Sequence, residues 1–219
     1  MKTALILGAS RGLGLGMAKE FQARGWQVIG TERSPSDLRT LDVTVETLDI
    51  TSQEQLAALR KRLDGQTIDL LFVNAAVASA DAPAASVETQ DFVDVMVTNV
   101  LSPMRAVETL DDLVPPTGTI AVMSSRQGSI AMNTNAGYEV YRASKSALNQ
   151  LMRCYAVRRE NDPRTLLLVN PGHVQTELGG PGAVRTVEEA VPPVVDTVEK
   201  RAGQGGFFFV DYNDQVVPW

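Results

Sequence analysis

Thr3-Ala-Leu-Ile-Leu-Gly8-Ala-Ser-Arg-Gly12-Leu-Gly14 is the stretch from which the architecture of this chain follows. Residues 3–7 form a short apolar run that is typical of a buried strand. The run breaks into a glycine-rich turn, and an amphipathic pattern follows from about Leu13 to Arg24. A strand, a glycine turn and a helix in this order form the context in which such glycines bind phosphate groups.

Each glycine of the turn has a physical role in this interpretation. Gly8 permits the tight turn, whereas Gly12 and Gly14 let a pyrophosphate approach the backbone and let the helix pack against the strand. The phosphates would then lie on unpaired N–H groups at the positive end of the helix dipole. The spacing is GxxxGxG, so the common GxGxxG dinucleotide motif is not matched literally, and a merely flexible glycine loop is the alternative.

Strand-like and helix-like patterns alternate along the rest of the chain. Further strands are expected at Gln27–Thr31, Val43–Leu48, Ile68–Asn74, Thr119–Ser124, Thr165–Val169 and Phe207–Val210. Helices are expected at Gln53–Leu63, Thr89–Leu113, Tyr141–Glu160 and Val187–Arg201. Such alternation predicts an α/β fold, a doubly wound parallel sheet with right-handed crossovers and helices on both faces. With no repeat and no long linker, residues 1–219 are expected to form a single domain.

Composition narrows the class of protein. The 219 residues are 44% hydrophobic and 21% charged, which suits one α/β domain with a sizeable core. The net charge of −6 argues against nucleic-acid binding, and no apolar stretch is long enough to span a membrane. Cys154 is the only cysteine, so no internal disulfide forms, and its helical setting suggests a buried thiol. No ligand cluster suggests a metal. A cytoplasmic protein is expected.

A phenol and an ammonium lie one helical turn apart in Tyr141-Arg-Ala-Ser-Lys145, downstream of the pair Ser124–Ser125. Residues at i and i+4 share a helix face, so Lys145 can favour loss of the Tyr141 proton. Tyr141 is therefore a candidate acid or base. The pattern alone is weak, because a buried tyrosine and a solvated lysine at this spacing are common in amphipathic helices.

The ordered set of motifs resembles the short-chain dehydrogenase/reductase family along the whole chain. The glycine turn, Asp49 in Leu-Asp-Ile-Thr, Asn74-Ala-Ala, the serine pair and Tyr141-xxx-Lys145 occur in the family's order. Ser-Ser-Arg-Gln-Gly-Ser-Ile, Gln-Thr-Glu-Leu-Gly-Gly-Pro and the final Pro-Trp look like the branch of C-factor signalling proteins and sniffer-type carbonyl reductases. The resemblance implies a Rossmann-type fold and an oxidoreductase that uses NAD(P)(H).

The resemblance also implies roles for four residues in catalysis. Tyr141 would exchange a proton with the carbonyl or alcohol oxygen of the substrate, and Ser125 would donate a hydrogen bond to that oxygen. Lys145 would lower the pKa of Tyr141 and hold the nicotinamide ribose. Asn99 would order a water molecule in a proton relay, although a polar residue satisfied by the local backbone is the alternative.

The cofactor would contact the residues that match the family's binding motifs. They are Gly8, Ser10, Arg11, Gly12, Leu13, Gly14, Glu32, Arg33, Asp49, Ile50, Asn74, Ala75, Ala76, Tyr141, Lys145, Pro171, Gly172, Val174 and Thr176. Asp49 would accept a hydrogen bond from the adenine amino group, or it would only cap the helix that starts at Thr51-Ser52. The sole histidine, His173, would touch the substrate or be an ordinary loop residue.

Two departures from the family's pattern bear on the site. The interval from Ser125 to Tyr141 is three residues longer than usual, and Tyr138 lies at the commoner spacing. Tyr138 is followed four residues on by Arg142, and an arginine is protonated too strongly for a relay, so Tyr141 is preferred. Ala76 stands where the family usually has glycine, which could shift cofactor binding slightly.

The choice between NAD and NADP depends on three charged residues. Glu32 could chelate the ribose hydroxyls of NAD and repel a 2′-phosphate. Arg33 and Arg11 occupy positions from which relatives grip that phosphate, and Glu32 is long enough to turn aside and pair with Arg33. The balance favours NADP(H). The alternative is that both arginines are solvated and Glu32 binds the ribose alone.

The resemblance leaves substrate and biological role open. The short, Gly/Pro-rich flap between Thr176 and Val187 suggests an open cleft for small or aromatic carbonyl or alcohol substrates. A dinucleotide-binding signalling protein with incidental turnover is the alternative. The resemblance further implies a homodimer or homotetramer built through Thr89–Leu113 and Tyr141–Glu160.

Overall fold

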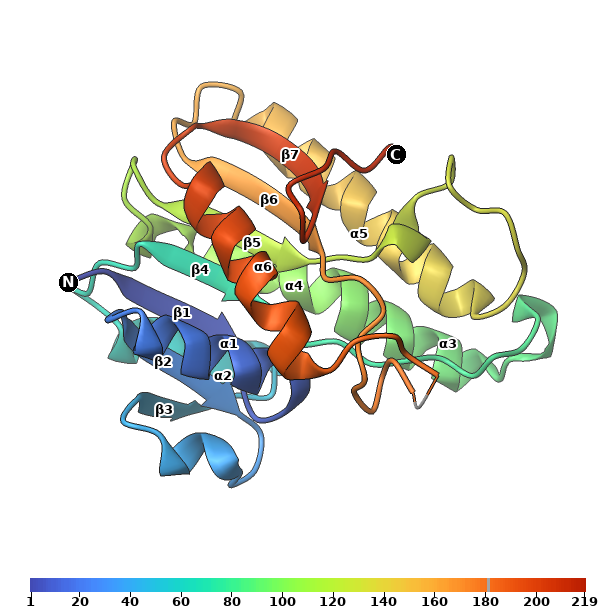
Figure 1. Ribbon diagram of the computed structural model, residues 1–219, viewed down its shortest axis with the longest axis horizontal. Coiled ribbons are helices and arrows are strands. Elements are labelled where there is room, and N and C mark those ends of the chain that lie inside the picture. Colours follow the sequence, from blue (N-terminus) through green and yellow to red (C-terminus); the bar gives the residue numbers. More distant parts are fainter. Residues whose placement is uncertain (181) are drawn as a thin grey trace.

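A computed structural model describes residues 1–180 and 182–219. Seven parallel strands form one sheet in the order β3-β2-β1-β4-β5-β6-β7 (Figure 1). The strands are β1 (Thr3–Leu7), β2 (Gln27–Glu32), β3 (Thr44–Thr47), β4 (Leu70–Val73), β5 (Thr119–Met123), β6 (Thr165–Asn170) and β7 (Gly206–Asp211). Each strand pairs in parallel with its neighbours, and this confirms the predicted doubly wound Rossmann-type sheet.

Helices cover both faces of the sheet. The main ones are α1 (Gly12–Ala23), α2 (Gln53–Arg62), α3 (Thr89–Met96), α4 (Ser102–Leu110), α5 (Glu139–Arg158) and α6 (Val187–Arg201). Figure 1 shows α1 and α6 side by side on the near face of the sheet. The helices α2, α4 and α5 pack on the other face. The sheet is therefore buried on both sides, as parallel sheets usually are.

Each face has its own hydrophobic core. On the α1/α6 face, Ile6, Phe21 and Val194 are fully buried. On the other face, Leu7 and Leu148 belong to a second cluster that joins α2, α4 and α5 to the sheet. Alternate residues of β1 point into the two clusters because successive side chains of a strand face opposite sides.

The expected helix Thr89–Leu113 is divided. A π-helical turn, Val97–Leu101, separates α3 from α4, and a short 3-10 turn, Asp111–Leu113, follows α4. Pro103 lies in the first turn of α4 and has no amide hydrogen. The carbonyl of Asn99 consequently lacks the donor four residues on that an α-helix provides, and the helix widens where Asn99 lies.

Cys154 is exposed, so the prediction of a buried thiol is wrong. The buried positions of α5 follow a stripe that includes Tyr141, Lys145, Leu148, Met152 and Tyr155. Cys154 lies on the opposite side of the helix from this stripe. A hydrophobic residue type in a helix does not by itself show which face the residue occupies.

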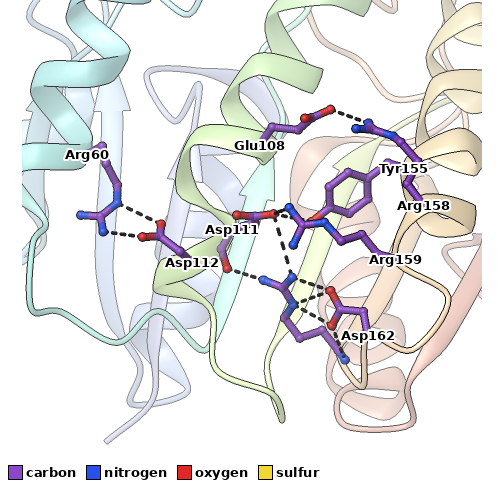
Figure 2. Close-up of polar contacts among 9 residues, drawn as sticks. Arg60, Glu108, Asp111, Asp112, Tyr155, Arg158, Arg159 and Asp162 are labelled. Carbon is purple, nitrogen blue, oxygen red and sulfur yellow. Dashed lines mark hydrogen bonds and ion pairs between the residues drawn. The ribbon is translucent and has the colours of Figure 1, made fainter.

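A polar network ties α4 to α5 at the edge of the sheet where β5 and β6 begin (Figure 2). Buried Asp111 accepts a hydrogen bond from the Tyr155 hydroxyl at 2.7 Å and forms an ion pair with Arg159, also at 2.7 Å. Arg164 donates to the backbone carbonyl of Asp111 and pairs with Asp162. This network lies at the edge opposite the carboxyl ends of the strands, so it supports the fold and is remote from the cleft described next.

Candidate functional site

A cleft of about 1930 Å³ opens at the carboxyl ends of the strands. It spans the point where β1 has β2 on one side and β4 on the other, which is where ligands bind in open α/β sheets. Nearly all the residues predicted from the sequence to touch cofactor or substrate line it. They include Gly8, Ser10, Arg11, Gly12, Leu13, Glu32, Arg33, Asp49, Ile50, Asn74, Ala75, Ala76, Ser125, Tyr141, Lys145, Pro171, Gly172, Val174 and Thr176.

Two glycines of the turn, Gly8 and Gly14, have no room for a side chain. Gly8 has a φ of 87°, and a Cβ at Gly14 would lie 2.0 Å from the Gly8 carbonyl oxygen. The Asn74 amide donates to that same carbonyl at 2.8 Å. The Gly8 N–H in turn donates to the Thr31 hydroxyl at 2.9 Å. The turn is therefore held in one shape by β2 and by the segment after β4.

The amino end of α1 is available to an anion. Arg11 is the N-cap residue, and its side chain makes no capping hydrogen bond. The first N–H groups of a helix need partners from outside it. A glycine cradle beside uncapped N–H groups at a helix amino end fits a pyrophosphate.

The Glu32 carboxylate is bound by neighbouring side chains, so it is not free to chelate the ribose hydroxyls of NAD. Its side chain is fully buried and accepts hydrogen bonds from Ser36, at 2.6 Å, and from Arg39. Burial raises the pKa of Glu32, but the hydrogen bonds from Ser36 and Arg39 and the Arg39 charge outweigh it, so the net pKa is lowered. The predicted pairing of Glu32 with Arg33 is wrong. The 3-10 turn Asp37–Thr40 brings Arg39 to the carboxylate instead.

Arg33 and Asp49 lie near each other at the same end of the cleft. Arg33 is exposed, and its charge contributes to a lowered pKa of Asp49. The main cause of that shift is a hydrogen bond from the Thr51 hydroxyl, at 2.7 Å, and the Thr51 N–H binds the same carboxylate oxygen at 2.9 Å. Ser52 caps α2. Asp49 therefore shapes the turn before α2 and still lines the cleft.

Tyr141, Ser125 and Lys145 meet at the other end of the cleft. Tyr141 lies in the first turn of α5, and burial raises the pKa of its phenol to about 12, opposed by a hydrogen bond with Ser125. The Lys145 ammonium lies 5.7 Å from the centre of the Tyr141 ring and donates to the Met123 carbonyl at 2.9 Å. Burial lowers the pKa of Lys145 to about 8. The net shift of the Tyr141 pKa is thus upward, opposite to the direction expected from the lysine.

Asn99 is fully buried, and its side chain is fully engaged. The side-chain oxygen accepts from the Val77 N–H at 2.8 Å, and the side-chain nitrogen donates to the Val77 carbonyl at 2.9 Å and to the Ser144 hydroxyl at 3.1 Å. Ser144 donates in turn to the Tyr141 carbonyl at 2.7 Å. Asn99 therefore links α5 to the segment after β4, and it is not among the residues that line the cleft.

The loop after β6 forms one wall of the cleft. Asn170 ends β6, and its side-chain oxygen accepts from the N–H groups of Arg126 and Gly172. A Cβ at Gly12 would lie 3.2 Å from the Thr176 methyl group, so this loop lies against the glycine turn. His173 contacts the Gly179 carbonyl at 2.8 Å, which favours the loop role over substrate contact.

The flap from Thr176 to Thr186 is short, and the residues just before it are hydrogen-bonded to Arg185 near its end. The Gln175 N–H donates to the Arg185 carbonyl at 2.7 Å, and Val174 bridges Arg185. Glu177 forms an ion pair with Arg11. This pair connects the flap to the glycine turn. Pro181, part of the motif quoted for the family, lies outside the described residues.

Several residues that line the cleft were not predicted from the sequence. They are Gln127, Met132, Thr134, Asn135, Tyr138, Arg142, Gln215, Val216, Val217 and Pro218, among others. Tyr138 is 42% exposed at the rim, whereas Tyr141 is 9% exposed, which favours Tyr141 as the reacting phenol. The last residues reach the cleft only because β7 follows β6 in the sheet. No local pattern in the sequence signals that contact.

Neither a metal-binding cluster nor a membrane-spanning helix occurs in the described part of the chain. No group of three or more His, Cys, Asp or Glu side chains in residues 1–180 and 182–219 could hold a metal ion. No helix within those ranges is both long and apolar enough to cross a membrane.

Three comparisons with known proteins, by family, by sequence and by structure, point to the same family. The family described as short chain dehydrogenase matches residues 2–183. A short-chain dehydrogenase/reductase from Burkholderia multivorans with bound NADP superposes with a TM-score of 0.98 at 48% identity, covering 100% of this chain and 99% of that one. A carbonyl reductase from Pseudomonas aeruginosa PAO1 in complex with NADP has a TM-score of 0.93 and 36% identity, with both chains covered completely. The 1-hydroxy-2-glutathionyl-2-methyl-3-butene dehydrogenase of Rhodococcus sp. (strain AD45) is 30% identical over the full length of both proteins.

Proposed function

This chain belongs to the short chain dehydrogenase family, and from that premise we propose that it transfers a hydride between NADP(H) and a small or aromatic carbonyl or alcohol. One observation carries the proposal. Ser125, Tyr141 and Lys145 line the same cleft as the glycine turn of residues 8–14. A protonated phenol therefore faces the space that a dinucleotide on the glycine turn would reach.

The residues of the cleft fit a dinucleotide cofactor. A Cβ at Gly14 would collide with the Gly8 carbonyl oxygen, so glycine there lets α1 start close against the turn, and the uncapped amino end of α1 suits the pyrophosphate. Lys145 would hold the nicotinamide ribose, and the backbone of Val174 would meet the carboxamide. When bound, the nicotinamide supplies or accepts the hydride at the substrate carbon.

Tyr141 would provide the proton that accompanies the hydride. Its raised pKa keeps the phenol protonated at neutral pH, so in the direction of reduction it donates to the substrate oxygen. Ser125 would hydrogen-bond that oxygen and stabilise the charge that develops on it. Lys145 would replace the lost proton through water held at the Asn99 carbonyl. In support of this route, Pro103 has no N–H, so the Asn99 carbonyl lacks the donor four residues on that a regular α-helix would give it.

The charges at the adenine end favour NADP over NAD. Ser36 and Arg39 already occupy the Glu32 carboxylate, so Glu32 is poorly placed to chelate ribose hydroxyls. Arg33 remains exposed beside the cleft, where its guanidinium could bind a 2′-phosphate bidentately. Arg11 would contribute after separating from Glu177. The bound NADP in two similar structures agrees with this balance.

The substrate end of the cleft mixes apolar and polar groups. Met132, Tyr138 and Val216 supply apolar surface, and Gln127 and Gln215 supply hydrogen-bonding groups. Tyr138 and Val216 are 42% and 74% exposed, so the substrate end is open to solvent. An open cleft with an aromatic rim suits small or aromatic carbonyl compounds better than a substrate that must be fully enclosed.

An oxidation screen tests the proposal. NADPH and NADH would each be incubated with the protein and a panel of aldehydes, ketones and quinones, and cofactor absorbance would be followed. We expect turnover of at least one carbonyl class, with a higher kcat/KM for NADPH than for NADH. Absence of turnover across the panel, together with no binding of either cofactor, would contradict the proposal.

We also propose a homodimer or homotetramer that uses α3, α4 and α5. Phe92, Val93, Leu151 and Val157 are between 39% and 59% exposed on these helices, and large exposed apolar side chains favour association. Val95, Leu148 and Met152 are core residues instead. Sedimentation at micromolar concentration should show a species of at least twice the 23.6 kDa chain mass. A single species at that mass would refute the assembly.

A further inference from the structure

The helix that carries Tyr141 begins in an unusual way. Its N-cap residue is Tyr138, which has left-handed backbone angles (φ 50°, ψ 38°) and whose side chain makes no capping hydrogen bond. Gly137, just before it, has a φ of 108°. Left-handed angles are uncommon for residues other than glycine. Something outside the helix must therefore hold the start of α5 in this shape.

The segment after β4 supplies the missing partners. The Asp81 carboxylate accepts from the Tyr138 N–H at 2.9 Å, and the Ser79 hydroxyl oxygen accepts from the Tyr141 N–H at 3.1 Å. In return, the Glu139 carboxylate accepts from the Ala84 N–H at 2.8 Å. Each segment thus satisfies backbone groups of the other. The first amides of a helix normally depend on the helix's own N-cap side chain.

The same segment is anchored at its other end by Asn99. The Asn99 side chain makes two hydrogen bonds to the backbone of Val77, and Val77 and Ala78 line the cleft. The chain from Val77 to Asp81 therefore runs as a brace from Asn99 to the first turn of α5. Any shift of the Asp81 end would move the backbone that carries Tyr141.

We propose that Asp81 is a positioning residue for Tyr141, and that Ser79 and Glu139 complete the brace. This inference rests on the proposed function of Tyr141 as the proton donor. Asp81 is exposed and is not among the residues that line the cleft, so it acts through the backbone of Tyr138. An error of about 1 Å in the position of a catalytic group costs up to about a hundredfold in rate.

Amide hydrogen exchange tests the brace without reference to turnover. Asp81→Ala should speed exchange of the Tyr138 amide by at least about tenfold, because that amide loses its acceptor. The Tyr141 amide, whose acceptor is the Ser79 hydroxyl, should also exchange faster because the brace that holds Ser79 in place is weakened. Asp81→Asn keeps an acceptor oxygen and should stay near the wild type. Glu88→Ala is the matched control, an exposed carboxylate at the start of α3 with no capping bond. Equal exchange in Asp81→Ala and Glu88→Ala would overturn the proposal.

Kinetics test the consequence for catalysis. Asp81→Ala should lower kcat about tenfold or more while the Kd for NADPH changes less than about twofold, and Asp81→Asn should recover most of the rate. Glu139→Ala against Glu139→Gln repeats the comparison from the helix side. An unchanged kcat in both alanine variants would overturn the positioning role. A wild type without turnover would defeat the proposed function, and the exchange experiment would still decide whether the brace exists.

Discussion

Replacing Lys145 by methionine should change how the stability of this protein depends on pH. The Lys145 side chain is 2% exposed, and burial lowers its pKa from 10.5 to about 8. Its only hydrogen-bond acceptor within residues 1–180 and 182–219 is the Met123 carbonyl. The folded protein therefore holds an ammonium that water would solvate better.

The sign and size of the effect follow from the two pKa values. Below pH 8 the ammonium is charged in both states, and the folded state carries the full cost. Between pH 8 and 10.5 the unfolded chain keeps a proton that the folded protein has lost, so stability rises with pH. At about 1.4 kcal/mol for each pKa unit, the cost present at pH 7 and removed by pH 10.5 is about 3 kcal/mol.

The assay is urea unfolding of both proteins without cofactor. The unfolding free energy of the wild type minus that of Lys145→Met should rise by about 3 kcal/mol between pH 7 and pH 10.5. Loss of the hydrogen bond to Met123 affects the variant equally at both pH values and cancels in this comparison. A difference that stays constant within about 1 kcal/mol would refute the claim that burial depresses the Lys145 pKa.

Three further predictions concern the fold and the cofactor. Asp111→Ala should lower the unfolding free energy by about 1–3 kcal/mol, because it leaves the buried Tyr155 hydroxyl without its acceptor. Asp112→Ala, which breaks an exposed pair, should cost under about 1 kcal/mol, and equal losses in urea titrations would contradict this account. Gly14→Ala should abolish cofactor binding or destabilise the protein by about 1–3 kcal/mol or more, because its Cβ would meet the Gly8 carbonyl oxygen. If the calorimetric Kd for the cofactor and the melting temperature both equal those of the wild type, the described close packing of Gly14 against Gly8 is wrong. Arg33→Ala should lower kcat/KM for NADPH about tenfold and leave kcat/KM for NADH unchanged. If the ratio of the NADPH value to the NADH value is the same in the variant and the wild type, Arg33 does not recognise the 2′-phosphate.

The sequence predicted the sheet well because its signals are local. Apolar runs of strand length and the glycine turn at residues 8–14 depend on neighbours a few positions away. The same holds for the Tyr141 and Lys145 pair, whose spacing already places both side chains on one face of α5. Gly8, Gly12, Tyr141 and Lys145 line one cleft, whereas Gly14 lies behind it, packed against the Gly8 carbonyl.

Features that depend on distant contacts were not predictable in the same way. The partner of Glu32 is Arg39, which arrives through a 3-10 turn that no periodicity marks. The upward shift of the Tyr141 pKa depends on how deeply α5 is buried, which the spacing to Lys145 does not reveal. The π-helical turn at Asn99 left one sequence signal, Pro103 within an otherwise continuous helical pattern.

The central claim is that Tyr141 donates the proton during carbonyl reduction. The direct measurement compares Tyr141→Phe with Tyr138→Phe, using NADPH and the best carbonyl substrate of the screen. We predict that Tyr141→Phe lowers kcat by at least about a hundredfold with little change in the Kd for NADPH, while Tyr138→Phe keeps kcat within about tenfold of the wild type. Equal turnover by Tyr141→Phe and the wild type, or a larger loss in Tyr138→Phe, would contradict the account.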